Sequence, residues 1–502
     1  MFSILTVFLS AVVISTTSSI VYNLYLSPLS RFPGPAICAV SRIPYLWHNW
    51  KGKLVHWVHD LHLTYGDVVR IAPDELTFIN IEAHKDIYGL GSRNLRDRRF
   101  YGETPKGVQD ILRSDDRNHA RFRRVLNHSL SERAIQEKQS MIRWHDDKLV
   151  EKIRSSFSFS SSSSSAATPT HDFDVTRLYD LTTFDIMAEL CFGEPLYVHK
   201  SDEFHGWMDS MFTMIHHAAV FRTAQYFRWT LIFVPVVMFV LGPLMKKQES
   251  YFKKCQERVD RRMESKLPRK DMWSHIIDLP KELQLTRSEM HFNSQILMIG
   301  GTETTATLLA GMTCYFLRSP QIMEKLCAEI RDAFQSESDI TAPWLSWNIL
   351  TLAFKRVFAS FLRLLWEWRV SLPLKEILSA GIRSLGMYTG ISIYGGAIAW
   401  SPKHFKNPKQ YVPERWLNDP EYAQDNRAAL QPFSYGPRSC VGQTFAYHEA
   451  RIILATLLWH FDMSLCEESI GWPDDLTVYM GWVKKPLMVR MQSRQGDGVM
   501  VS

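Results

Sequence analysis

Phe433-Ser434-Tyr435-Gly436-Pro437-Arg438-Ser439-Cys440-Val441-Gly442 is the stretch of this chain that decides its fold. It follows the pattern F-x-x-G-x-R-x-C-x-G and lies directly before a helical pattern of apolar residues from about Gln443 to Trp459. The positive end of that helix would face the sulfur of Cys440 and favour its thiolate form. The stretch therefore predicts a cysteine that binds a metal. The alternative is a buried structural cysteine in a glycine-bearing loop.

The same ten residues resemble the haem-binding loop of the haem-thiolate monooxygenases, the cytochromes P450. In that family a cysteine thiolate binds the haem iron, because its electron donation favours cleavage of the dioxygen bond. The resemblance implies that Cys440 is the iron ligand and that Phe433 packs beside it. It also implies that Arg438 binds a haem propionate through its fork of donors. Gly436 and Gly442 would let the backbone lie close to a flat macrocycle.

Composition and cysteine spacing narrow the class of protein. The chain has 502 residues, 46% of them hydrophobic, and its net charge of +6 includes no basic run typical of nucleic-acid binding. Its seven cysteines are irregularly spaced without a CxxC pair, which predicts neither a disulfide framework nor a second metal site. We therefore expect a reducing compartment and no nucleic-acid partner.

The first thirty residues carry no charged side chain, and from Ile4 to Leu26 they are apolar enough to span a bilayer. A cleaved signal peptide would need a basic start, and none is present. The first basic residue, Arg31, follows the span, which predicts a single-pass anchor with the rest of the chain in the cytosol. The predicted units are a membrane anchor at 1–26, a proline-rich hinge and linker at 27–52, and a catalytic domain at 53–502.

The segment after the hinge predicts a helix and a small sheet. Lys53–Tyr65 has a helical pattern, and Val68–Ile71 and Leu76–Ile79 have the composition of two short strands. A basic helix follows from Asp115, in which His119 and Arg123 share a face. The resemblance implies that these two residues hold haem propionates. The alternative is a solvated basic face.

Two segments in the middle of the chain are unusual in composition. Ser155–Thr170 is a serine tract too polar to bury a core, which predicts a flexible loop between helices. Trp229–Met245 is strongly apolar but contains Pro235, Gly242 and Pro243, so it is a poor candidate for a second span. By resemblance it contacts the bilayer surface and lines the substrate entrance. The alternative is a core helix.

A long apolar helix is predicted to begin at Thr286-Arg287-Ser288-Glu289, which fits a capping box, and to run to about Leu317. Gly300-Gly301-Thr302-Glu303-Thr304-Thr305 interrupts it with poor helix formers, which predicts a local bulge. This motif resembles the oxygen-activating segment of the cytochromes P450. The resemblance implies that Thr304 relays protons and that Glu303 connects the relay to solvent. The alternative is a Gly/Thr-rich packing seam.

One family motif is incomplete. Pro413-Glu414-Arg415-Trp416 matches P-E-R-[FW], but the partner motif E-x-x-R aligns with Ser360 to Arg363, where serine replaces the glutamate. Arg363 and Arg415 would then be like charges, unfavourable unless another acid such as Glu367 reaches them. The departure continues to about Thr389. A misread reading frame or intron between about 342 and 389 would explain it, and so would a degenerate enzyme.

The resemblance implies a mainly α fold with small β-sheets, a cytochrome P450-like haem domain behind an N-terminal transmembrane helix. It implies insertion of one oxygen atom from dioxygen into an apolar small molecule. The cofactor is haem b on Cys440, with electrons from NADPH through NADPH–cytochrome P450 reductase. The likeness is to fungal members of specialised metabolism in the endoplasmic reticulum membrane. Two alternatives remain: a relative that rearranges peroxides without a reductase, and a haem-binding membrane protein impaired by Ser360.

Overall fold

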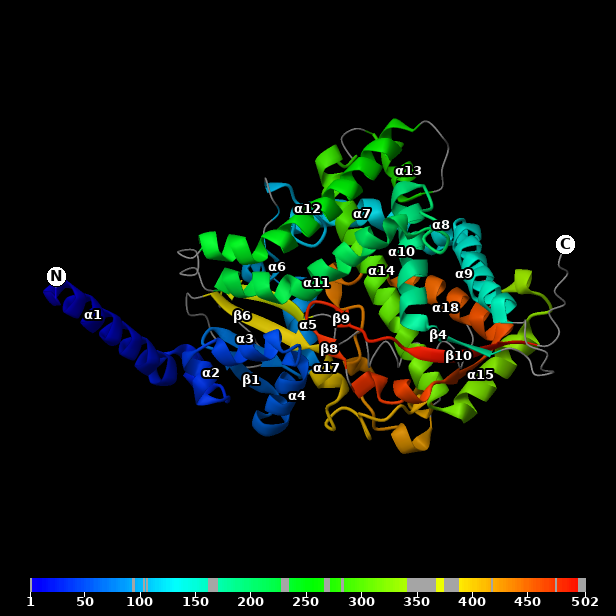
Figure 1. Ribbon diagram of the computed structural model, residues 1–502. Coiled ribbons are helices and arrows are strands. Elements are labelled where there is room, and N and C mark those ends of the chain that lie inside the picture. Colours follow the sequence, from blue (N-terminus) through cyan, green and yellow to red (C-terminus); the bar gives the residue numbers. More distant parts are fainter. Residues whose placement is uncertain are drawn as a thin grey trace.

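The structure, a computed structural model, is mainly helical with three small sheets, as predicted (Figure 1). The residues that it describes are 2–92, 95–102, 104, 107–160, 170–226, 234–265, 271–280, 284–340, 367–373, 388–416, 419–474 and 476–494. Ser360, Arg363 and most of the departing segment lie outside these residues. So do 161–169 of the serine tract and 229–233 of the apolar segment.

The centre of the protein is α14 (Arg287–Leu317), which packs against α10 (Val175–Phe192) and α18 (Gln443–His460) (Figure 1). The predicted capping box starts it: Thr286 Oγ1 accepts a hydrogen bond from Glu289 N at 3.2 Å, and Thr286 N donates to Glu289 Oε2 at 2.9 Å. Side chains along α14 are buried on most sides, as expected of a helix that is apolar all round.

The other described α-helices complete the helical part of the fold. They are α1 (Phe2–Val21), α2 (Ala36–Val40), α3 (Ile43–Trp50), α4 (Leu54–Tyr65), α5 (Glu82–Tyr88), α6 (Arg98–Tyr101), α7 (Asp116–Ser129), α8 (Glu132–Gln136), α9 (Gln139–Ser160), α11 (His205–Tyr226), α12 (Val234–Glu264), α13 (Met272–Ile277), α15 (Pro320–Ala333) and α17 (Gly395–Ala399). The helices predicted from Lys53, Asp115 and Gln443 are therefore confirmed as α4, α7 and α18.

The largest sheet has the order β1-β2-β6-β5-β3, in which β2 and β6 are parallel and the other pairs antiparallel. The first two strands confirm the predicted N-terminal sheet. Its strands are β1 (Val68–Ala72), β2 (Glu75–Phe78), β3 (Leu95–Arg96), β5 (Glu367–Pro373) and β6 (Tyr388–Tyr394). The smaller sheets consist of β4 (Thr170–Asp174), β10 (Met488–Ser493) and β7 (Phe461–Leu465), and of β8 (Thr477–Val478) and β9 (Trp482–Val483).

The N-terminal helix projects from the rest of the protein (Figure 1). From Ile4 to Leu26 it is 23 residues long, with a mean hydropathy of 2.1 and none of its most apolar window buried. Its last turn, Tyr22–Leu26, is a π-helix. Among the described residues it is the one helix long and apolar enough to cross a membrane, and its limits are those predicted.

The proline hinge is fixed to the first sheet rather than free. Arg70 N on β1 donates a hydrogen bond to Pro33 O at 2.8 Å. The Arg70 side chain donates to Asn23 O at 2.7 Å and to Pro73 O at 2.6 Å. At Gly34 a Cβ atom would lie 2.4 Å from Arg70 O, so only glycine permits this approach. The end of the N-terminal helix is thereby tied to β1.

Two local expectations are wrong. The loop predicted from Ser155 does not begin there, because α9 continues to Ser160; the Ser155 hydroxyl donates to Lys152 O at 2.8 Å and is satisfied within the helix. The bulge predicted at Gly300–Thr305 is absent from α14, which is α-helical throughout. The helix-breaking residues of the apolar segment, Pro235, Gly242 and Pro243, do not interrupt α12, which is continuous from Val234.

Candidate active site

The loop before Cys440 has a conformation that its sequence enforces. Cys440 N donates to Phe433 O at 2.8 Å, which closes the loop. Gly436 has φ +75°, and a Cβ atom there would lie 1.9 Å from Tyr88 O. A short 3-10 turn, Gly436–Arg438, follows, and α18 starts at Gln443. The loop is therefore pressed against the end of α5 at a position that only glycine can occupy.

Burial governs the charge of Cys440. It raises the pKa of the Cys440 thiol, while the Gly442 N–H and the Arg123 guanidinium act in the opposite direction. The helix end and Arg123 therefore favour the thiolate as expected, but without a bound metal the loss of hydration on burial outweighs them. A metal cation at the sulfur would supply the missing charge, since a coordinating thiol is deprotonated.

A cavity of about 180 Å³ separates Cys440 from α14. Its wall on the α14 side includes Gly300, Gly301, Thr304 and Thr305, and Phe433 lies beside Cys440 on the other side. Apolar side chains line other parts of the cavity: Met187, Leu190, Ile296, Leu297, Phe445 and Ala446. The cysteine loop and the Gly/Thr motif, far apart in the sequence, therefore face the same cavity.

Four basic side chains form one wall. Arg96, His119, Arg123 and Arg438 line this cavity and also an adjoining cavity of about 500 Å³. Burial, together with Arg438, Arg96 and Arg123, lowers the pKa of His119 to about 3, so this imidazole is neutral at physiological pH. Arg96 was not predicted as a cavity residue. Its neighbours in the sequence, Leu95 and Asp97, belong to no motif that would identify it.

The basic wall is only partly satisfied within the protein. Arg123 donates to Ser439 O and, at 3.3 Å, to Ser439 Oγ. Arg438 Nη2 donates to Ser114 O and Asp116 Oδ1, both at 2.8 Å, but its Nη1 is buried without a hydrogen-bond partner among the described residues. An uncompensated buried guanidinium nitrogen favours an anionic ligand at this wall.

These features fit a haem. A flat macrocycle with two carboxylates needs an iron ligand, apolar walls and cations for the carboxylates, and the cavity wall provides Cys440, apolar side chains and the basic residues. The five residues predicted to bind the cofactor all lie in this wall: His119, Arg123, Phe433, Arg438 and Cys440.

The two glycines of α14 differ in role. A Cβ atom at Gly301 would lie 2.2 Å from Met187 Sδ, so Gly301 allows α10 to pack closely. At Gly300 a Cβ atom would meet nothing within 4 Å, and this residue opens the cavity. Thr304 Oγ1 donates to Gly300 O at 2.5 Å, which leaves its oxygen lone pairs to accept a hydrogen bond from the cavity.

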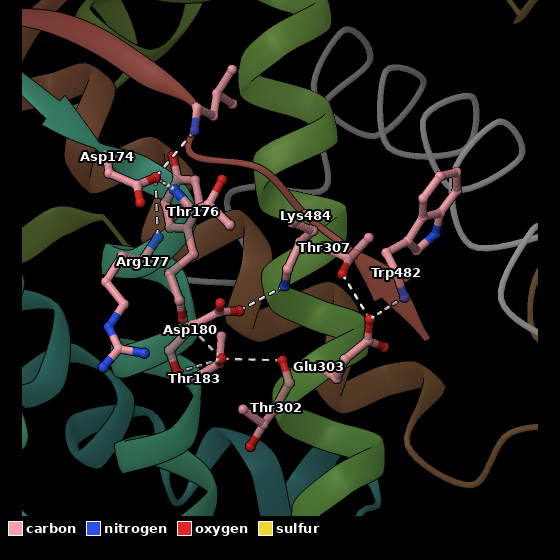
Figure 2. A network of polar contacts seen from close by, with 12 residues as sticks. Asp174, Thr176, Arg177, Asp180, Thr183, Thr302, Glu303, Thr307, Trp482 and Lys484 are labelled. Carbon is pink, nitrogen blue, oxygen red and sulfur yellow. Dashed lines mark hydrogen bonds and ion pairs between the residues drawn. The ribbon is translucent and has the colours of Figure 1, made fainter. Parts of the chain in front are cut away.

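Glu303 lies away from the cavity wall, although Thr304 is its neighbour. It is 3% exposed, and its Oε1 accepts hydrogen bonds from Trp482 N at 3.0 Å and Thr307 Oγ1 at 3.1 Å (Figure 2). Lys484 lies close by and donates to Asp180 Oδ1 on α10 at 2.6 Å (Figure 2). Burial raises the pKa of Glu303, and Lys484 opposes the shift.

Arg415 finds an acid that the sequence analysis did not identify. Asp425 forms an ion pair with it, and the two side chains are 4% and 3% exposed. Arg415 Nη2 also donates to Lys406 O at 2.6 Å. The expected stand-in, Glu367, lies in β5, where the structure does not describe its side chain. No residue pattern in the sequence marks Asp425 as this partner.

Comparisons with known proteins cover almost the whole chain. The chain matches the model of the family described as Cytochrome P450 over residues 34–347 and 380–491, with a gap inside the departing segment. It is 35% identical over 489 residues to the cytochrome P450 monooxygenase efuB of Hormonema carpetanum (94% of this chain, 93% of that protein). It is 32% identical over 498 residues to averantin hydroxylase of Dothistroma septosporum (97% and 91%). The fold resembles a solved cytochrome P450DA heme domain, with a TM-score of 0.72 and 17% identity over 92% of this chain and 98% of that one.

Proposed function

This chain belongs to the cytochrome P450 family, and on that basis we propose which of its residues carry out the monooxygenase reaction. The protein is an oxidoreductase that inserts one oxygen atom from dioxygen into an apolar small molecule. The observation that carries the assignment of residues is that Cys440 and Thr304 line one largely apolar cavity with a basic wall.

The cofactor is haem b, with Cys440 as the iron ligand. Bound there, the haem would activate dioxygen, and the thiolate would favour cleavage of the O–O bond. Arg438, Arg123 and His119 bind the propionates, and Arg96 joins them because it lines the same two cavities. Arg438 contributes most, because its buried Nη1 has no hydrogen-bond partner among the described residues. Phe433 packs beside the sulfur.

The reaction consumes two protons, because the second oxygen atom of dioxygen leaves as water. Thr304 holds a hydrogen-bonded water in the cavity: its hydroxyl donates to Gly300 O and accepts from that water. Glu303, whose pKa burial raises, holds a proton behind the helix and replenishes the relay from the side of Trp482 and Lys484. The apolar walls exclude other water from the reacting atoms.

Electrons come from NADPH through NADPH–cytochrome P450 reductase. The protein is held in the endoplasmic reticulum membrane by residues 1–26, with 27–52 as hinge and 53–502 as the cytosolic catalytic domain; the exposed apolar helix Ile4–Leu26 supports this arrangement. The substrate is an apolar intermediate of fungal specialised metabolism, as the relative named averantin hydroxylase suggests. The relatives named as monooxygenases speak against a peroxide-rearranging enzyme and against a protein without turnover.

The test is the spectrum of the reduced, carbon monoxide-bound protein. We expect the red-shifted Soret band of a thiolate-bound haem, which Cys440→Ser abolishes. Cys327→Ser is the matched control, because this half-buried cysteine lines a different, surface groove beside α15. Consumption of NADPH in the presence of the reductase then separates turnover from haem binding alone. Loss of the band in both variants, or in neither, would contradict the assignment of Cys440.

A further inference from the structure

An asparagine inside α14 joins that helix to a turn in the wall of the active-site cavity. Asn293 is 0% exposed and lies in the interior of the helix, where asparagine is a poor helix former. Its Oδ1 accepts a hydrogen bond from Ile111 N at 2.9 Å, and its Nδ2 donates to Glu289 O at 2.8 Å. One end of the amide is therefore fixed within the helix, and the other end holds a backbone group from a distant part of the chain.

The turn on the other side of this contact, residues 110–114, is stiff in itself. Asp110 Oδ1 accepts hydrogen bonds from Leu112 N at 2.9 Å and from Arg113 N at 2.8 Å, and Asp110 Oδ2 accepts one from Arg113 Nε at 2.7 Å. Ser114 N donates to Asp110 O at 2.9 Å. These short-range bonds fix the backbone of the turn, but they do not fix its position relative to other elements.

Two longer-range contacts set that position. Near the start of the turn, Asn293 on α14 accepts the hydrogen bond from Ile111 N. At the end of the turn, Ser114 O accepts a hydrogen bond from Arg438 Nη2 at 2.8 Å. The turn is therefore held between the central helix and the loop that carries Arg438.

The turn contributes two apolar side chains to the active site. Ile111 and Leu112 both line the cavity of about 180 Å³, whereas Asn293 does not belong to its wall. The backbone N–H that Asn293 holds is that of Ile111 itself. The amide therefore sets where these two side chains stand, although it would not contact a molecule in the cavity.

We propose that Asn293 is a positioning residue for the substrate, because it fixes Ile111 and Leu112 as a rigid part of the cavity wall. The inference rests on the proposed function, since it needs a haem and an apolar substrate in this cavity. A rigid wall favours one orientation of the bound molecule, because binding loses no free energy to ordering the protein. A loose wall would admit several orientations, of which fewer place the reacting atom correctly.

Substitutions at Asn293 separate the hydrogen bond from side-chain packing. Asn293→Ala leaves Ile111 N without this acceptor inside the protein, so the turn shifts or loses protection. Asn293→Asp should restore the contact, because a buried carboxyl keeps its proton and then accepts from Ile111 N and donates to Glu289 O. Ser294→Ala is the matched control: Ser294 is also 0% exposed, and its Oγ donates to His291 O at 2.9 Å within α14.

Hydrogen exchange of the haem-loaded, full-length protein tests the contact. In Asn293→Ala, peptides that cover residues 110–114 should exchange about tenfold faster than in the wild type, because the buried amide has lost its acceptor. Asn293→Asp and Ser294→Ala should exchange like the wild type. Equal exchange in Asn293→Ala and the wild type would overturn the proposal.

Two ligands of the haem iron test the wall. Imidazole and 1-phenylimidazole both bind through a ring nitrogen, and the second adds an apolar ring to the cavity. The dissociation constant of 1-phenylimidazole relative to that of imidazole should rise about fivefold in Asn293→Ala, because the ligand must now order the turn. The ratio should return to that of the wild type in Asn293→Asp. In an Ile111→Ala background, which shortens the wall, Asn293→Ala should raise the ratio much less.

The remaining outcomes decide against the proposal or against its premise. An unchanged ratio in Asn293→Ala at normal haem content would overturn the proposal. An equal rise in Ser294→Ala, or a full fivefold rise in the Ile111→Ala background, would also overturn it, because either result would indicate a general loss of packing. Failure of imidazole to shift the haem spectrum of the wild type would contradict the proposed function instead.

Discussion

Arg415 and Asp425 form an ion pair in which both side chains are almost completely buried. Asp425 also accepts a hydrogen bond from Lys406 N at 2.7 Å, and Arg415 stacks on Phe405 and Tyr422. The arginine of the P-E-R-W motif thus has an acidic partner supplied by the segment that leads to the Cys440 loop. The ion pair therefore joins two segments that both precede the Cys440 loop in the sequence.

Breaking this pair should destabilise the fold. Asp425→Asn leaves a buried guanidinium without its counter-charge and should lower the free energy of unfolding by about 3–5 kcal/mol, measured by chemical denaturation. Asp172→Asn is the control, since its pair with Arg490 is exposed and should be worth about 1 kcal/mol or less. Equal effects of the two substitutions would mean that the buried pair has no special role.

Gly436→Ala should abolish haem binding. The new Cβ atom would lie 1.9 Å from Tyr88 O, so the loop must move away from α5 and carry Cys440 with it. Gly66→Ala provides the comparison: its φ is +96° but nothing lies within 4 Å, so that variant feels only backbone strain of about 1–3 kcal/mol. The amplitude of the carbon monoxide band per protein measures both, and a full band in Gly436→Ala would refute the contact.

Glu303 should make stability depend on pH. Its folded-state pKa is raised from the ordinary value of 4.5, so between that value and the folded pKa the folded protein keeps a proton that the unfolded chain loses. Stability should therefore fall as pH rises through this window. Glu303→Gln, which keeps an acceptor for Trp482 N, should remove the slope in melting temperature. Thr307→Val keeps the carboxyl and should retain it; a slope that survives Glu303→Gln would exclude this source.

His119 should act in the opposite direction in the haem-free protein. Its pKa is lowered from 6.5 to about 3. Below pH 6.5 this imidazole therefore binds a proton in the unfolded chain but not in the folded protein. Stability should fall as the pH decreases from 6.5 toward 3, by up to about 1.4 kcal/mol per pH unit. His119→Phe should flatten this dependence in denaturation curves. A parallel curve for the variant would show that other groups cause the acid sensitivity.

The sequence predicted those parts of the site that lie within single elements. The Cys440 loop, the capping box at Thr286 and the shared face of His119 and Arg123 follow from local patterns, and the structure contains each of them. Their positions depend on turn chemistry and helical periodicity, which a short stretch of residues specifies.

The rest depends on contacts between distant elements. Arg96 in the basic wall, Asp425 beside Arg415, and Lys484 near Glu303 occupy no recognisable spacing, because the fold alone brings them together. Burial of Cys440, which opposes its thiolate form and outweighs the helix end and Arg123 when no metal is bound, is likewise not specified by the local sequence.

The hydrogen bond between Arg70 N and Pro33 O would set the orientation of the domain relative to a lipid surface. A helix joined by a slack linker would act as a tether, and the domain would tumble beneath it. Here the hinge is hydrogen-bonded to β1 and the helix end to Arg70, so the helix has a fixed orientation relative to the domain. In a bilayer, the tilt of this helix would set the depth in the lipid from which the domain takes up a dissolved substrate. A longer hinge would release that orientation and change which compounds reach the active site.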